Sequence, residues 1–241
     1  MTLPLPAAGS RRLLTAVVAL AAVLVAGVLV VWNNVVVPDL PADPAVRTVA
    51  NVALVAVLVA GARVGGLSWA DLGLCRTTWR AGARWGGGAV LLAAAVYALA
   101  YAVPATRPLL QDAGTASGPT QELLLRALVL IPVGTVLCEE LAFRGVLHAL
   151  GVRVLPARGA LVVSAAVFGA WHVAGATAAP TGGLPGAGST LLAVGVVVAV
   201  TVVGGVLLAA VRRRTGSLLA PIGVHLGTNV VGLVAVLLAT R

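Results

Sequence analysis

Long apolar stretches separated by short polar segments dominate this sequence. Seven of these stretches approach the roughly 20 residues that a helix needs to cross a bilayer. They extend over about residues 13–32, 46–62, 85–103, 121–143, 159–178, 190–211 and 217–240. Their apolar residues do not alternate with period two, as they would in the strands of a transmembrane barrel. The pattern predicts an all-α, polytopic membrane helix bundle of about seven transmembrane helices, the fourth continuing as a helix toward Leu150.

Arginines gather at alternate ends of the predicted spans, and the chain contains no lysine. The clusters are Arg11 and Arg12; Arg63, Arg76, Arg80 and Arg84; Arg153 and Arg158; and Arg212, Arg213 and Arg214, whereas Asp39, Asp43, Asp112 and Arg107 lie in the opposite loops. Cytoplasmic loops of membrane proteins carry the excess of basic residues. The alternation therefore predicts a cytoplasmic N-terminus and a C-terminus on the outer side. Residues 63–84, with Trp69, Trp79 and Trp85, are expected at the cytoplasmic interface, and residues 180–189 form an outer connection.

Composition supports this class of protein and narrows its partners. The mean hydropathy is +1.08 and 60% of the residues are hydrophobic, more than a soluble domain carries. The net charge of +9 is explained by the arginines that flank the spans, so a nucleic-acid partner is not predicted. Abundant arginine, alanine, valine and glycine are typical of a GC-rich bacterial genome. We therefore expect a multi-pass protein of a bacterial plasma membrane, and the bilayer is its first partner.

We expect residues 1–241 to form a single membrane domain with two functional regions. The spans within residues 1–110 contain almost no ionisable groups and are expected to act as scaffold helices. The polar candidates all fall within residues 120–235. The two cysteines, Cys75 and Cys138, do not form a metal-binding spacing or a disulfide framework, and Cys138 is interpreted as a small buried apolar residue.

Glu139 and Glu140 stand side by side at the end of the fourth apolar stretch, in a chain with only seven acidic residues. A carboxylate at the centre of a membrane helix costs on the order of 2.5–3.5 kcal/mol, so it usually has a partner and a function. Glu140 and Arg144 are four residues apart, in the favourable order for an ion pair on a helix. Glu139 lies about 100° around the helix from Glu140. We therefore expect Glu140 to pair with Arg144 and Glu139 to face a cavity; His148, one turn farther on, is expected at the surface.

Three other polar residues lie at compatible depths on two further spans. At 1.5 Å per residue, His172 is roughly 20 Å along the fifth span and His225 roughly 12 Å along the seventh. Asn229 lies four residues after His225, so the two side chains are expected to point to one place. Polar groups at such depths avoid lipid. Together with Glu139 they are predicted to converge on one cavity in the cytoplasmic half of the bilayer.

These residue types suit the hydrolysis of an amide bond. A carboxylate and two imidazoles can hold and activate water, and an asparagine can stabilise a developing oxyanion. Two histidines and a carboxylate are also a familiar set of zinc ligands, so a metal-assisted route is equally open at this point. The chain contains neither the His-Glu-x-x-His motif of zinc proteases nor the Gly-x-Ser-x-Gly motif of serine hydrolases.

Three motifs on separate spans together resemble a known family. They are Glu139-Glu140-x-x-x-Arg144, Phe168-x-x-x-His172 and His225-x-x-x-Asn229, with spacings of 33 residues from Glu139 to His172 and 53 from His172 to His225. This set resembles the CAAX protease and bacteriocin-processing (CPBP) family of intramembrane proteases, which is related to the type II CAAX prenyl endopeptidase. The resemblance covers about residues 120–235, and the first three spans match in hydropathy alone.

The resemblance implies a role for each matched residue. Glu139 would act with His172 to activate water, and His225 with Asn229 would stabilise the oxyanion. Under the metalloprotease interpretation of the family, His172 and His225 would bind zinc together with Glu139. The supporting residues would be Glu140, Arg144 and Phe168.

The expected function is that of an intramembrane endopeptidase of the glutamate or metallo type, which cleaves a peptide bond near the cytoplasmic membrane face. Its substrate would be a peptide or the lipidated C-terminus of a protein, and prenylation of that substrate is not implied by a bacterial origin. One alternative is a non-catalytic bacteriocin immunity or scaffold protein, in which the polar residues only lock helices together. The other is a carrier of ions or protons, because membrane glutamates and histidines also form proton relays.

Overall fold

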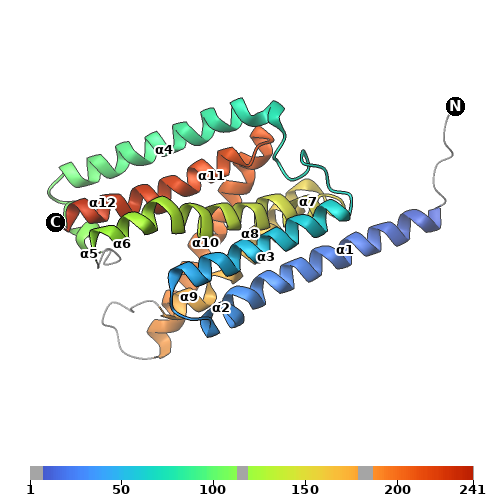
Figure 1. The fold of residues 1–241 in the computed structure, drawn as a ribbon, viewed down its shortest axis with the longest axis horizontal. Helices are drawn as coiled ribbons and strands as arrows, with labels where there is room; N and C mark the ends of the chain where they lie inside the picture. The colour runs from blue at the N-terminus through green and yellow to red at the C-terminus, as the bar shows by residue number, and fades with distance from the viewer. Residues whose placement is uncertain (1–7, 113–118, 179–186, 241) are drawn as a thin grey trace. The chain divides into compact units, whose positions relative to one another are not determined.

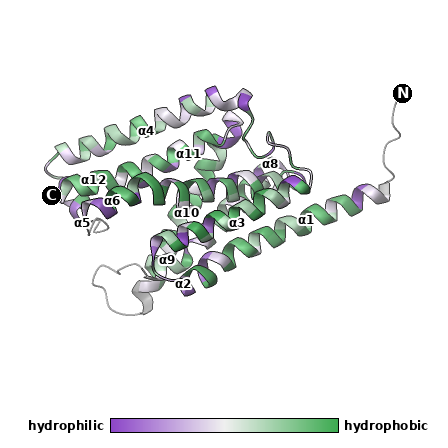
Figure 2. Cartoon of the chain, viewed as in Figure 1, coloured by the Kyte–Doolittle hydropathy of each residue, from purple (hydrophilic) through white to green (hydrophobic). Residues whose placement is uncertain are grey.

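The computed structural model describes residues 8–112, 119–178 and 187–240, which contain helices and no strand. Seven helical segments are long and apolar enough to cross a membrane: Gly9–Asp39, Pro44–Val64, Arg76–Ala102, Thr120–Gly151, Ala157–Thr177, Thr190–Thr215 and Leu219–Ala239. They confirm the predicted multi-pass helical class, and the fourth segment passes Leu150 as expected. Figure 2 shows hydrophobic colour along the middles of these helices and hydrophilic colour mainly near their ends. Residues 180–186 of the predicted outer connection lie outside the described residues.

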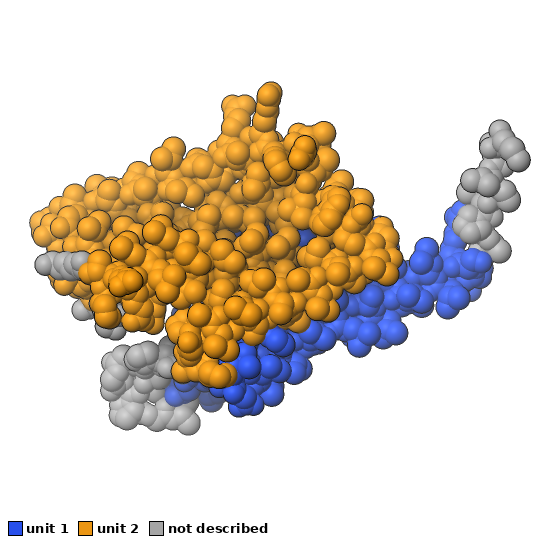
Figure 3. Space-filling view, in the orientation of Figure 1, with its two compact units in different colours: residues 1–40, 143–209 blue, residues 41–142, 210–241 orange. Residues whose placement is uncertain are grey.

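The chain divides into two compact units, coloured separately in Figure 3. Unit 1 consists of residues 1–40 and 143–209, and unit 2 of residues 41–142 and 210–241. Each unit therefore combines helices from the expected scaffold region with helices from the region that carries the three motifs.

Unit 1 contains the first span and most of the fourth-to-sixth-span region. Its elements are α1 (Ala8–Val31), η1 (Trp32–Val36), α2 (Val37–Asp39), α7 (His148–Gly151), α8 (Ala157–Trp171), α9 (Val173–Ala178) and most of α10 (Ala187–Thr215). Helix α1 contacts both α7 and α8 (Figure 1). Helices α8 and α10 approach closely at small residues, since a Cβ added to Gly205 would lie 3.0 Å from the Cα atom of Ala165.

Unit 2 contains the third and seventh spans of the chain, which lie against each other. Its elements are α3 (Pro44–Val64), η2 (Arg76–Thr78), α4 (Trp79–Ala102), α5 (Arg107–Asp112), α6 (Thr120–Leu125), η3 (Arg126–Leu137), α11 (Leu219–Leu226), η5 (Gly227–Val231) and α12 (Gly232–Ala239). Helix α4 runs alongside α11 and α12 (Figure 1), and α3 lies against η3. The Asn51 side chain joins the latter pair by donating to the carbonyl oxygen of Gly134 at 3.1 Å.

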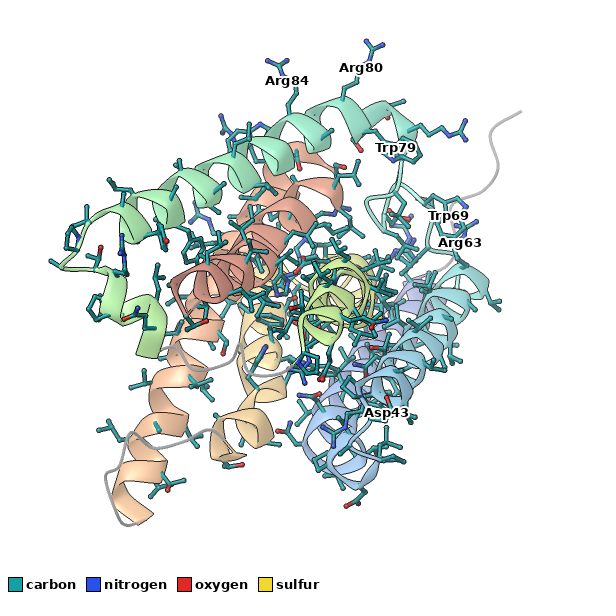
Figure 4. All side chains as sticks on the ribbon, turned by 60° about the vertical axis from the view of Figure 1, so that its left-hand side comes forward. Asp43, Arg63, Trp69, Trp79, Arg80 and Arg84 are labelled. Carbon is teal, nitrogen blue, oxygen red and sulfur yellow. The ribbon has the colours of Figure 1, made fainter. Side chains whose placement is uncertain are left out.

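Two arginine clusters meet at one end of unit 2. The Arg212 guanidinium donates to the carbonyl oxygen of Asp71 at 3.0 Å and so connects the end of α10 to the loop that follows α3. Arg214 stacks over the Trp85 ring of α4, 5.6 Å from its centroid. Figure 4 shows Asp43 at the other end of α3 from Arg63. This arrangement matches the predicted alternation of loops, and the assignment of the arginine-rich end to the cytoplasm stays a prediction.

The contact between α4 and α11 depends on facing glycines. A Cβ atom added to Gly86 would lie 2.5 Å from the carbonyl oxygen of Leu219, and one added to Gly223 would lie 2.3 Å from the Cα atom of Gly86. Small residues at such crossings let two membrane helices bring their backbones together. The next residue, Gly87, has nothing within 4 Å of the corresponding position.

We expect Gly86→Ala to lower stability by about 1–3 kcal/mol, because the added methyl group would force α4 and α11 apart. Gly87→Ala is the matched control on the same helix and should leave stability unchanged or slightly raised. Thermal unfolding of the two variants in the same detergent measures the difference. Equal shifts for both variants would contradict the close α4–α11 contact.

His148 is buried, with 6% of its surface exposed, and the expectation that it lies at the surface is wrong. It was placed there because it follows Arg144 by one turn at a predicted membrane boundary. Helix α7, which begins at His148, instead lies against α1 and α8 within unit 1. These two helices cover the end of the fourth span. The length of an apolar stretch does not indicate such burial by other helices.

Candidate active site

Two carboxylates and one imidazole form a buried cluster in unit 2. Glu140 is fully buried, and its Oε1 atom lies 2.9 Å from Nδ1 of His225. Oε2 of Glu139 lies 3.9 Å from Nε2 of the same ring. Both ring nitrogens of His225 are therefore directed at carboxylates, and the imidazole is 7% exposed. The fourth and seventh spans are brought together here by residues that the sequence had singled out.

The cluster departs from the expected division between the two glutamates. Glu139 was expected to face His225 and Glu140 to turn away, yet Glu140 makes the closer approach. The fourth span is wound as a π-helix in η3 and again in η4, which covers Glu140–Leu147. A π-helix has more residues per turn than an α-helix, so the angle between consecutive side chains is smaller. Adjacent glutamates can then reach one ring. The predicted pairing of Glu140 with Arg144 stays a prediction.

Asn229 lies on the wall of a cavity in unit 2. The cavity has a volume of about 480 Å³, and its lining includes Tyr97, Arg126 and Thr228. The Thr228 hydroxyl oxygen lies 2.9 Å from the carbonyl oxygen of His225 and 3.2 Å from Oδ1 of Asn229. Asn229 belongs to the π-helical segment η5, so the four-residue offset from His225 does not give the register of an α-helix.

His172 ends helix α8 in unit 1. Its φ and ψ angles are −91° and 2°, and its Nδ1 atom lies 2.7 Å from the carbonyl oxygen of Phe168. A carbonyl oxygen can only accept a hydrogen bond, so this contact requires the proton on Nδ1. In a neutral imidazole, Nε2 is then the nitrogen with a free lone pair. The helix end thus selects the tautomer in which Nε2 can act as a base.

Phe168 supports His172 in a second way. The Phe168 and His172 rings meet edge to face with centroids 4.7 Å apart. Phe143 meets Phe168 at 5.0 Å, and the Arg144 guanidinium carbon lies 4.1 Å from the Phe168 centroid. Within unit 1, Phe168 therefore contacts both the imidazole of His172, a predicted catalytic residue, and the guanidinium of Arg144, a predicted supporting residue.

Two asparagines of the first span, Asn33 and Asn34, hold the backbone around His172, and sequence analysis missed them. Asn34 donates to the carbonyl oxygen of Ala170 at 2.9 Å and accepts from the amide of Ala174 at 2.7 Å. Asn33 donates to the carbonyl oxygen of Trp171 at 2.7 Å. Two consecutive asparagines in an apolar span indicate a contact with another helix, because polar side chains in membranes usually form hydrogen bonds between helices.

The predicted zinc ligands are divided between the two units. Among residues 8–112, 119–178 and 187–240, no three side chains of histidine, cysteine, aspartate or glutamate lie close enough together to hold a metal ion. His225 has a carboxylate at each of its nitrogens, and the Nδ1 contact with Glu140 is the kind that orients a metal-binding histidine. Within unit 2, Glu139 and His225 would supply two of the three ligands that a catalytic zinc site uses, and the third predicted ligand, His172, belongs to unit 1. Zinc binding stays a prediction.

The helices and the cluster define a polytopic membrane protein with a buried glutamate–histidine site. Residues 120–231 match the model of the family described as Rce1-like, type II CAAX prenyl endopeptidase Rce1-like. The match includes all three motifs and confirms the resemblance to the CPBP family. No curated protein and no solved structure matches the chain significantly.

Proposed function

We propose that the protein is an intramembrane endopeptidase that uses water activated by glutamate and histidine to hydrolyse a peptide bond near the arginine-rich, cytoplasmic membrane face. The observation that carries the proposal is the approach of Glu139 and Glu140 to the two nitrogens of His225 in a buried site. The family match over residues 120–231 supports a protease in general. The glutamate mechanism and the roles of individual residues belong to the proposal.

In the proposed mechanism Glu139, together with Nε2 of His172, removes a proton from water. The resulting hydroxide attacks the peptide carbonyl carbon, and the carbonyl oxygen becomes an oxyanion. Asn229 and His225 donate to this oxygen, while Glu140 holds His225 through Nδ1. The C–N bond then breaks, and the leaving amine takes the proton that Glu139 had accepted. One water is consumed, and a carboxylate and an amine are released.

The proposed substrate is a peptide segment or the lipidated C-terminus of a protein in the same bilayer. A cleft within a helix bundle reaches substrates that the membrane brings to it, so a lipid anchor would raise the local concentration of substrate. We place the protein in a bacterial plasma membrane on the basis of its composition. Prenylation of the substrate is not part of the proposal.

The test uses the full-length protein in proteoliposomes with quenched fluorescent peptides, each made with and without a C-terminal lipid. Cleavage by the wild type that is lost on mutation of Glu139 or His172 supports the proposal. Equal cleavage by the wild type and both variants overturns it, and the residues would then serve an immunity or scaffold protein. The same assay with a zinc chelator should leave the rate unchanged, whereas loss of activity restored by zinc would show a metal-assisted route.

Asn34→Leu is expected to reduce the cleavage rate by about tenfold or more, because it removes both contacts that fix the backbone beside His172. A displacement of about 1 Å in a catalytic group can cost on the order of 10²-fold in rate. Asn51→Leu is the matched control, since Asn51 also donates to a backbone carbonyl, in unit 2. Equal rate losses for both variants at equal thermal stability would show that Asn34 has no specific effect on His172.

A further inference from the structure

A second cavity in unit 2 runs beside α4 and is separate from the glutamate–histidine cluster. Its volume is about 680 Å³, and it lies between α4, the last turns of α10 and α11. The residues that line it are Ala81, Arg84, Trp85, Gly88, Ala89, Leu92, Val211 and Val224. None of them belongs to the three motifs of the proposed catalytic site. We call this cavity the α4 groove.

The α4 groove is cationic at one end only. Arg84 lines it near the start of α4, and Arg214 lies over the Trp85 ring at 5.6 Å from the centroid. Figure 4 shows Arg80 and Arg84 extending away from α4 at this end. Both Arg84 and Arg214 are exposed, and no acidic residue lines the groove. Guanidinium groups bind phosphate in a bidentate manner, and an indole favours the headgroup level of a bilayer.

The rest of the α4 groove is apolar and open. Leu92, eight residues after Arg84, is 67% exposed, and about 12 Å of helix separate the two. A Cβ atom added to Gly88 would have no heavy atom within 4 Å, in contrast to Gly86 on the face toward α11. Val211 and Val224 form the opposite wall. The groove therefore changes from cationic to apolar along the direction of a membrane-spanning helix.

We propose that the α4 groove binds one anionic phospholipid. Its phosphate contacts Arg84 and Arg214 beside Trp85, and one acyl chain lies along Gly88 and Leu92 against the opposite wall. Basic pockets between membrane helices bind anionic headgroups in this way, and a volume of a few hundred cubic ångströms is ordinary for a ligand site. The cationic end of the groove matches the phosphate of this ligand, and the apolar end matches its acyl chain. A free phosphate would leave the apolar end empty, and an uncharged lipid would leave the arginines without an anion.

The test titrates the full-length protein in detergent with phosphatidylglycerol and measures retained lipid by native mass spectrometry. Arg84→Gln and Arg214→Gln should each weaken binding about fivefold. Gly88→Leu should weaken it by a similar factor or more by filling the groove, without loss of thermal stability. The matched control is Arg158→Gln, which removes an exposed arginine from the first turn of α8 and should have no effect.

Three results would overturn the proposal. The first is equal retention of phosphatidylglycerol and uncharged phosphatidylcholine, and the second is equal weakening by Arg158→Gln and Arg84→Gln. The third is the absence of any contribution from the apolar part of the groove, seen either as unchanged binding in Gly88→Leu or as full competition by glycerol 3-phosphate. Gly88→Leu keeps the test decisive if an arginine variant does not fold. Peptide cleavage is not needed for any of these measurements.

Discussion

Glu139→Gln is expected to reduce the peptide cleavage rate by about 10²–10⁴-fold, the usual contribution of a general base. Glutamine keeps the size of the side chain and can still form a hydrogen bond, but it cannot accept the proton from water. Glu139 is buried, and its carboxylate lies 3.9 Å from Nε2 of His225. The expected result is therefore a large loss of the maximal rate with little change in the Michaelis constant.

The matched control is Glu122→Gln on the same span. Glu122 is 45% exposed and forms an ion pair with Arg126 at 3.0 Å, so unlike Glu139 it is a solvent-accessible carboxylate outside the buried cluster. Its replacement should leave cleavage within about twofold of the wild type, because exposed ion pairs contribute roughly 0–1 kcal/mol. If both variants cleave as the wild type does, Glu139 is not the base. If Glu139→Gln unfolds, its rate is uninformative, and thermal unfolding of each variant detects this case.

His225→Ala is expected to abolish cleavage and to lower stability by about 3–5 kcal/mol. The substitution removes the imidazole that lies 2.9 Å from the fully buried Glu140 carboxylate. Removing the hydrogen-bond partner of a buried carboxylate is costly because the carboxylate stays in a medium that solvates it poorly. Thermal unfolding in detergent and the proteoliposome assay measure the two effects separately.

Glu140→Gln provides the comparison for His225→Ala. The amide oxygen of glutamine can still accept a hydrogen bond from Nδ1, so this variant should fold and keep a reduced rate. The expected order of stability is wild type, then Glu140→Gln, then His225→Ala. A stable Glu140→Gln variant whose rate falls as far as that of Glu139→Gln would contradict the proposed division, because Glu140 would then act on water rather than on His225.

The helical class and the main site residues could be predicted from the sequence because each depends on a local pattern. Apolar length sets the seven spans, and the cost of a carboxylate in lipid marks Glu139 and Glu140 as candidate site residues. The convergence of Glu139 with His225 followed from depth along two helices, and the structure brings these two residues together. These conclusions need no knowledge of how the helices contact each other.

The remaining features depend on helix winding and on contacts between distant segments. The π-helical turns around the glutamates are not encoded in apolar periodicity, so the approach of Glu140 to His225 was missed. His148 was misplaced because burial by α1 and α8 is a long-range contact. Asn33 and Asn34 form hydrogen bonds with residues 136–140 positions away. A local sequence pattern does not reveal such contacts, so the first span was predicted to be scaffold alone.

The glycine run Gly86–Gly87–Gly88 has a mechanical consequence for α4. Each glycine weakens an isolated helix by about 1 kcal/mol relative to alanine, so three in succession lower the local stability of α4. Gly86 meets the α11 backbone, while Gly87 and Gly88 have open space beside them. Contact with α11 therefore keeps α4 straight where its own backbone is weakest. Any separation of these two helices would turn the run into a hinge, and the first turns of α4, which carry Arg80 and Arg84, would swing about it.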